Sequence, residues 1–169
     1  MVPGEHGRCC AVTQRLFLTL LALFLPAAAQ AATCTISATG VSFGTYVPSN
    51  ESPTDITGTV TVTCSSTTNQ TVSYTIALNA GVNSGSSFSN RRMTNGATFL
   101  SYQLYTNSAR TTVWGDGTGG TSTVTGSFRC NRCTNTKRNS TDYGRLPGLQ
   151  WSAAPGLYSD TITATVTFN

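Results

Sequence analysis

The last stretch of the chain constrains the fold most, because apolar and hydroxyl side chains alternate along it. Within residues 157–168 (LYSDTITATVTF), Tyr158, Ile162, Val166 and Phe168 share one register, while Ser and Thr fill most of the other positions. Such a period of two is typical of a strand with one buried face. The sequence ends one residue later. We therefore expect an earlier segment, or another molecule, to pair the outer edge of this strand.

The rest of the chain favours a single all-β sandwich. Only 9% of the 169 residues are charged, and the chain is rich in Gly, Thr and Ser, which are weak helix formers. Short alternating segments follow one another with turn residues between them, which indicates a sandwich and not a βαβ fold. The expected earlier strands are 34–38, 56–64, 72–78, 100–104 and 121–128, with 112–114 as a further short one, a long loop at 79–95 and a hairpin turn at 115–120.

Residues 1–31 are predicted to be a cleaved export signal. Arg8 and Arg15 precede an apolar run of about ten residues, which is too short to span a bilayer, and Pro26 ends it. Small residues follow, so cleavage is expected after Ala31 or, as the second choice, after Ala29. The mature domain would be residues 32–169. We expect a secreted protein that is not an integral membrane protein.

Four cysteines remain after such cleavage: Cys34, Cys64, Cys130 and Cys133. An even number of cysteines in an exported chain favours disulfides. A structural zinc site is the alternative, but it normally uses two close cysteine pairs, and Cys34 and Cys64 stand alone in the sequence. The spacing of Cys130 and Cys133 resembles a redox motif, although no βαβ context surrounds it.

Residues 129–145 are the most basic part of the chain. From Thr33 onward the sequence has eight basic and five acidic residues, and five of the eight lie in this segment. The net charge of +3 is too small to indicate nucleic-acid binding. The simplest interpretation is a surface loop held by a local disulfide, and the alternative is a contact patch for an acidic surface or a glycan. The possible surface contacts are Arg129, Arg132, Lys137, Arg138, Trp114 and Trp151.

The residue types that most catalytic sites need are missing. His6 is the only histidine, and it lies in the predicted signal, so the mature chain has no histidine for a catalytic triad or a metal site. The five remaining carboxylates fall in predicted turns or strand ends, where they usually serve the backbone or the solvent. We therefore expect no catalytic residues, no metal and no cofactor, and we interpret the protein as a non-enzyme.

With these residues laid out, the chain resembles the spore coat protein U domain family, whose secreted bacterial members overlap with subunits of archaic chaperone-usher pili. The resemblance covers nearly the whole predicted mature chain and rests on the order and number of short matching pieces. These pieces are Cys34, residues 41–48 (VSFGTYVP), 58–64 (GTVTVTC), 74–79 (YTIALN), 92–93 (RM), 100–105 (LSYQLY), 114–115 (WG), 143–147 (YGRLP) and 155–168 (PGLYSDTITATVTF).

The resemblance implies an immunoglobulin-like sandwich that lacks its final strand. A periplasmic chaperone would hold it, an outer-membrane usher would export it, and a strand from a neighbouring subunit would complete it at the cell surface. Such a pilus, fimbrial or spore coat component would act in cell adhesion or biofilm formation. By the same analogy, Cys34 and Cys64 form a disulfide, and Tyr158, Ile162, Val166 and Phe168 line the floor of the donor-strand groove.

One departure from the family concerns the N-terminus. Polymerising subunits carry an extension before the first cysteine, which is the strand they donate, whereas cleavage after Ala31 leaves only Ala32 and Thr33 here. Such a chain accepts a strand without giving one, which fits a tip or terminal subunit or a coat component attached otherwise. The alternative is that the apolar run is not fully removed. A self-complete secreted adhesin or glycan-binding module is the alternative function.

Overall fold

The computed structural model describes residues 31–169 and is built almost entirely from antiparallel strands. The leader expected at 1–31 lies, except for its last residue, outside these described residues. The elements are β1 (Thr33–Thr39), β2 (Thr54–Ser65), β3 (Asn69–Leu78), a 3-10 turn η1 (Phe88–Asn90), β4 (Arg92–Thr94), β5 (Phe99–Ser101), β6 (Gln103–Tyr105), β7 (Val124–Asn131), β8 (Thr136–Leu146) and β9 (Ala164–Phe168).

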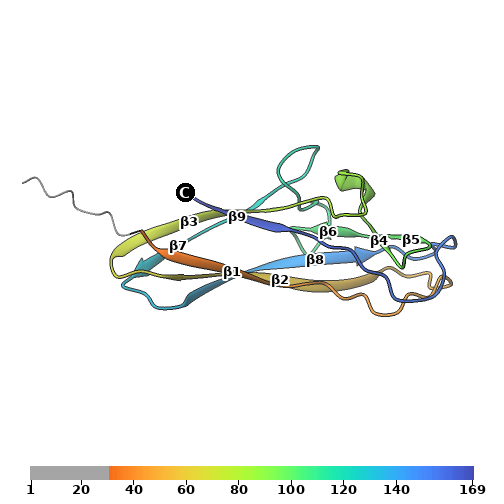
Figure 1. Ribbon diagram of the computed structural model, residues 1–169, viewed down its shortest axis with the longest axis horizontal. Helices are drawn as coiled ribbons and strands as arrows, with labels where there is room; N and C mark the ends of the chain where they lie inside the picture. The colour runs from red at the N-terminus through yellow and green to blue at the C-terminus, as the bar shows by residue number, and fades with distance from the viewer. Residues whose placement is uncertain (1–30) are drawn as a thin grey trace, which may run out of the picture.

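Two sheets face each other along an elongated molecule (Figure 1). One sheet has the order β1-β2-β8-β6 and the other β7-β3-β9, while β4 and β5 form a separate hairpin. Immunoglobulin sandwiches of the constant type place four strands opposite three in a related order, with a seventh strand beside the sixth. Among the described residues, no strand pairs with the outer edge of β9. The protein is thus an immunoglobulin-like sandwich in which β1 and β9 are edge strands of the two different sheets.

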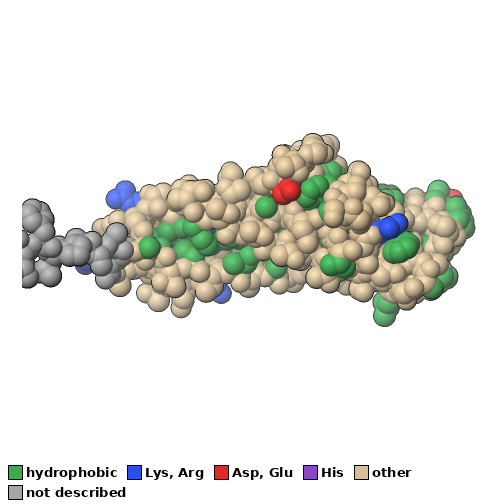
Figure 2. All heavy atoms as spheres, turned by 45° about the horizontal axis from the view of Figure 1, so that its top comes forward, with side chains coloured by type: hydrophobic (Ala, Val, Ile, Leu, Met, Phe, Trp, Pro, Cys, Tyr) green, Lys and Arg blue, Asp and Glu red, His purple; other side chains and the backbone are tan. Residues whose placement is uncertain are grey.

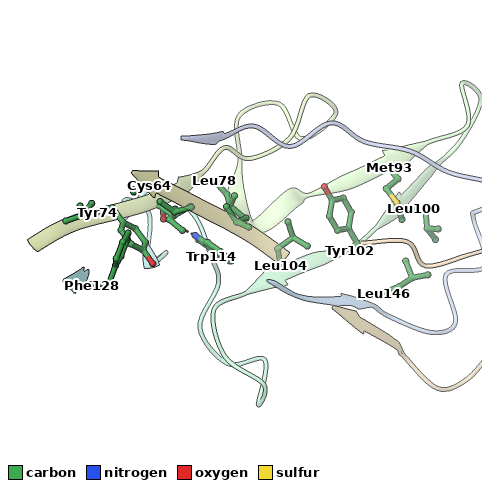
Figure 3. Packing of buried hydrophobic residues seen from close by; sticks show 14 of the residues in the cluster. Cys64, Tyr74, Leu78, Met93, Leu100, Tyr102, Leu104, Trp114, Phe128 and Leu146 are labelled. Carbon is green, nitrogen blue, oxygen red and sulfur yellow. Dashed lines mark hydrogen bonds between the residues drawn. The ribbon is translucent and has the colours of Figure 1, made fainter. Parts of the chain in front are cut away.

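The hydrophobic core lies between the two sheets because β2 and β3 alternate as the sequence predicts. Val60 and Val62 of β2 and Tyr74 and Ile76 of β3 are buried, while the residues between them are partly exposed. The core residues follow one another along the long axis of the molecule (Figure 3). Tyr74 and Phe128 lie at one end of this row, and Met93, Leu100 and Leu146 at the other.

The prediction that residues 129–145 form a surface loop is wrong for most of the segment. The loop is confined to the short connection between β7 and β8, and β8 pairs with β2 over its whole length, from Thr54↔Leu146 to Cys64↔Thr136. The first half of β8 is polar on both faces, so it shows no alternation of apolar residues. Its central place in the sheet comes from the backbone hydrogen bonds of β2 and not from burial of side chains.

Four other expected strands differ from the structure. The one expected at 112–114 forms only isolated bridges, and the one expected at 121–128 corresponds to β7 (Val124–Asn131). The strand expected at 100–104 is divided into β5 and β6 at Tyr102, whose N–H donates to the carbonyl of Arg91. The final strand is regular only in β9, because residues 157–163 run beyond the end of β3 and meet the connection that follows it. There the N–H of Asn79 donates to the carbonyl of Thr163, and Ser159 pairs with Thr94.

Candidate functional site

An open groove lies between two edge strands, β1 and β9, whose outer edges pair with no strand of residues 31–169. In Figure 1, β1 and β9 lie on the same side of the molecule, each at the edge of its own sheet. Figure 2 shows an elongated hydrophobic area where these two strands run. Ile36 of β1 is 40% exposed, and Ala164 and Val166 of β9 are only half-buried. We call this space the strand groove, with β1 and residues 40–44 as one border and residues 157–168 as the other.

The strand groove contains a pocket of about 470 Å³ with a mostly apolar floor. The two walls of this pocket are residues 40–44 and 157–162. Its floor is formed by side chains from β4, β5, β6 and β8 and from the residue between β5 and β6, all of them buried. These floor residues are Met93, Leu100, Tyr102, Leu104 and Asp142.

Two glycines allow residues 40–44 to cross the inner face of the first sheet. A Cβ atom on Gly58 would lie 2.7 Å from the carbonyl oxygen of Thr39, and one on Gly144 would lie 3.0 Å from the Phe43 ring. A side chain at either position would push this segment away. Phe43 instead packs beside Tyr102, with 6.0 Å between the ring centroids. The crossing narrows the strand groove and gives it an aromatic wall.

The opposite wall is held by a network of hydrogen bonds to one carboxylate, Asp160. Its Oδ1 accepts hydrogen bonds from the N–H groups of Val82, Asn83 and Thr161 and from the Asn83 amide. Its Oδ2 accepts one from the Tyr102 hydroxyl at 2.7 Å. Burial and this bond raise the pKa of Tyr102 well above its ordinary value, so the hydroxyl stays protonated and donates. Residues 157–163, which lie outside the regular ladder of β9, are fixed in this way.

The second carboxylate of the pocket is not satisfied. Asp142 is 9% exposed, and no hydrogen-bond partner reaches its Oδ1. Burial raises its pKa to about 6, although Arg91 acts in the opposite direction. Arg91 is also buried and donates to the Gln103 side chain and the carbonyl of Asn79, but its Nε has no partner. Its desolvation lowers the pKa of the guanidinium.

The structure places the four residues predicted for the groove floor at different depths. Tyr158 and Ile162 line the pocket, but on its wall, and Val166 is half-buried in β9. Phe168 is 42% exposed at the end of β9 and does not line the pocket. Sequence reasoning missed the floor itself. The alternation around Leu100 and Leu104 marked these residues as buried, but nothing in the sequence indicated that they face a groove.

The four cysteines form two disulfides: the Cys34–Cys64 bond that the resemblance implies, and a Cys130–Cys133 bond, whose pairing the sequence left open. Cys34–Cys64 joins directly opposed residues of β1 and β2, so it fastens the edge strand that borders the strand groove. Cys130–Cys133 closes the connection between β7 and β8. Among residues 31–169, no group of three or more His, Cys, Asp or Glu side chains lies close enough to bind a metal ion.

The predicted surface contacts do not form one surface. Trp114 is fully buried, and its indole N–H donates to the carbonyl of Ile76 at 3.0 Å, so its expected contact role is wrong. Trp151 is 68% exposed and lies after the end of β8. The basic residues lie near the start of β8, in and around its connection with β7. An eleven-residue strand separates the two places by about 35 Å. The basic residues Arg129, Arg132, Lys137 and Arg138 remain candidates for a contact of their own.

No helix of the described part of the chain has the length and apolar character that a membrane span requires.

Comparisons with known proteins identify a family and a similar solved structure. One similar solved structure is "Crystal structure of CsuC-CsuE chaperone-tip adhesion subunit pre-assembly complex from archaic chaperone-usher Csu pili of Acinetobacter baumannii", at 25% identity and a TM-score of 0.48. The match covers 80% of this chain but only 39% of that one. No curated protein matches the chain. The model of the Spore Coat Protein U domain matches residues 20–165. Because that match spans most of the sequence, the protein belongs to the Spore Coat Protein U domain family.

Proposed function

We propose that the protein is a non-catalytic structural subunit of a surface assembly, and that the strand groove takes up an extended segment from a neighbouring subunit. The carrying observation is the pair of edge strands β1 and β9, each of which lies next in the chain to one wall of the same pocket. An inserted strand gains main-chain hydrogen bonds from an edge, and its alternate side chains enter the space between the sheets. Membership of the Spore Coat Protein U domain family supports a pilus-type or coat component.

The proposal also includes the partners of the protein and its route of export. A long unpaired strand edge is a template for aggregation, so the subunit needs protection until a neighbour arrives. A periplasmic chaperone would provide it, followed by an outer-membrane usher and the neighbouring subunits at the cell surface. The signal at 1–31 and cleavage near Ala31 belong to the same proposal.

Thermal unfolding with a donor peptide tests this function. The probe is a synthetic peptide of about a dozen residues that alternates valine and threonine, which is long enough to span about 40 Å. It is added to the full chain expressed through the export pathway and purified from an oxidising compartment. We expect the midpoint to rise by more than about 10 °C, because a ligand that binds only the folded state stabilises it.

The control is a peptide of the same composition in which the valines and threonines are grouped in two blocks, so that neither face is apolar along its whole length. Hydrogen exchange adds a second readout, since the amides of β1 and β9 should slow only with the alternating peptide. A high midpoint that neither peptide moves, with no change in these amides, would refute strand uptake and favour a self-complete domain.

A second candidate function, adhesion, is favoured by one observation. Apolar side chains are concentrated in the loops at the end of the molecule farthest from the β7–β8 connection (Figure 2). Hydrogen bonds join these loops, with the N–H of Leu149 donating to Asn50 and that of Gln150 to the hydroxyl of Tyr46. The exposed side chains are Val47, Leu149, Trp151 and Leu157.

Such an end surface would suit a terminal subunit. The change Trp151→Ser should reduce retention of the purified protein on an apolar resin by severalfold, because Trp151 contributes a large exposed ring. Trp114→Phe is the control, since Trp114 is buried and should leave retention unchanged. Equal retention of the Trp151→Ser variant and the unmodified protein would argue against adhesion through this end of the molecule.

A further inference from the structure

The strand groove contains one polar atom that the fold leaves without a partner. Its two carboxylates differ sharply: Asp160 accepts hydrogen bonds at both oxygens, whereas the Oδ1 of Asp142 accepts none. Asp142 lines the pocket and is about nine-tenths buried. A buried acceptor without a donor is unfavourable, because it has lost its hydrogen bonds to water. A partner that supplies this donor would therefore recover free energy that an apolar partner does not.

The neighbouring residues do not provide that donor. Opposite Asp142 on β2 is Gly58, and two residues along β8 is Gly144, neither of which has a side chain. Arg91 is the nearby cation, but both of its terminal nitrogens already donate elsewhere, and no ion pair joins it to Asp142. Oδ1 itself is closed to solvent, but Asp142 borders the pocket, so a small turn of its carboxyl group would present an oxygen to an entering segment.

We propose that the segment taken up by the strand groove carries a serine or threonine hydroxyl at the inward position facing Asp142, so that Asp142 selects the partner and sets its register. This inference rests on the proposed function. A hydroxyl fits better than an amine or a guanidinium, because a second cation would be desolvated close to the buried Arg91. Threonine also has nearly the shape of valine, so it enters an apolar pocket without a change of volume.

The electrostatics agree with this choice. With a pKa of about 6, Asp142 is mostly ionised at neutral pH. Hydrogen bonds to a charged acceptor are stronger than those to a neutral one. Tyr102 cannot compete for the same role, since its hydroxyl already donates to Asp160. Asp142 is therefore the one acceptor in this floor that still lacks a donor. A partner strand bound in the wrong register would place an apolar side chain beside it and leave it without a hydrogen bond.

A positional scan tests the inference. The reference peptide carries valine at every inward position, and each valine is replaced in turn by threonine. We expect threonine to weaken binding severalfold at every inward position except one, because a buried hydroxyl without a partner is unfavourable. At the exceptional position, threonine should bind about tenfold tighter than valine.

Asp142→Leu should remove that preference and make valine the better residue at the same position. If this variant does not fold, Asp142→Asn, a neutral acceptor, should reduce the preference. Asp116→Asn, in an exposed turn away from the pocket, is the matched control and should keep it. A preference that persists in Asp142→Leu, or no exceptional position, overturns the inference but not strand uptake. Failure of every peptide to bind overturns the proposed function, and the inference with it.

Discussion

The two borders of the strand groove are held in different ways. On one side, β1 pairs with β2 along all of its residues, and the Cys34–Cys64 disulfide locks that pairing. On the other side, β9 is a shorter strand, and residues 157–163 are held by backbone hydrogen bonds to Asn79, Val82 and Thr94 and by those of the Asp160 carboxylate. The first border thus includes a covalent bond, whereas the second is held by hydrogen bonds. The border beside β9 is therefore held less firmly than the border beside β1. In the proposed function, a partner strand that pairs with β9 would add to this less firmly held border.

The largest expected effect comes from breaking the covalent border. Replacing Cys34 and Cys64 by alanine should lower the free energy of unfolding by about 3–4 kcal/mol, because the disulfide closes a loop of 30 residues. Denaturant unfolding of the purified variant measures this. The matched control replaces Cys130 and Cys133, which are only three residues apart, and should cost about 1.5 kcal/mol. Equal losses in the two variants would contradict the special role of the first disulfide.

The second expected effect concerns Asp142, in the floor of the pocket between the two borders. The pKa of Asp142 rises on folding from 3.8 to about 6, so its protonated form is favoured in the folded state. Its contribution is therefore fully present below about pH 4 and is lost as pH rises through 6, by at most about 3 kcal/mol.

Unfolding at pH 4 to 7 should show this loss in the unmodified protein but not in Asp142→Asn. The difference between the two proteins cancels the opposite contribution of Asp55, whose pKa is lowered by its hydrogen bond with Arg145. A difference that stays constant across this pH range would argue against a buried, unsatisfied Asp142.

The smallest effect tests the polar border. Asp160→Ala removes the acceptor for Val82, Asn83 and Tyr102 and should lower the free energy of unfolding by about 2 kcal/mol. Hydrogen exchange at Val82 and Asn83 should also become faster. Asp116→Ala is the control, because Asp116 binds only its own turn through Thr118. If exchange at these two amides is unchanged, the carboxylate does not hold this border.

Side-chain alternation predicted the strands that have one buried face. Val60 and Val62 in β2 and Tyr74 and Ile76 in β3 repeat at every second position, and the structure buries them. The same rule failed for β8, because its first half is polar on both faces and its pairing is made by backbone groups. The rule also predicted a last strand longer than the observed β9, because alternation does not show where the neighbouring strand β3 ends.

The groove was harder to predict than the sheets. Resemblance to the family directed attention to Tyr158 and Ile162, which do line the pocket. The floor residue Asp142 was expected in a turn or at a strand end, because a carboxylate is seldom buried without a partner. Trp114 was expected at the surface, yet its ring fills the core and its N–H is satisfied by a backbone carbonyl. In both cases the deciding information is a contact between distant parts of the chain.

The Cys34–Cys64 disulfide also fixes distances beyond its own strand pair. A slip of β1 by one residue would turn every inward side chain of that border outward, and the covalent bond forbids it. Each copy of the protein therefore turns the same side chains of β1 toward the strand groove. Under the proposed function, the oxidation of two thiols would give every copy the same alignment with its partner strand.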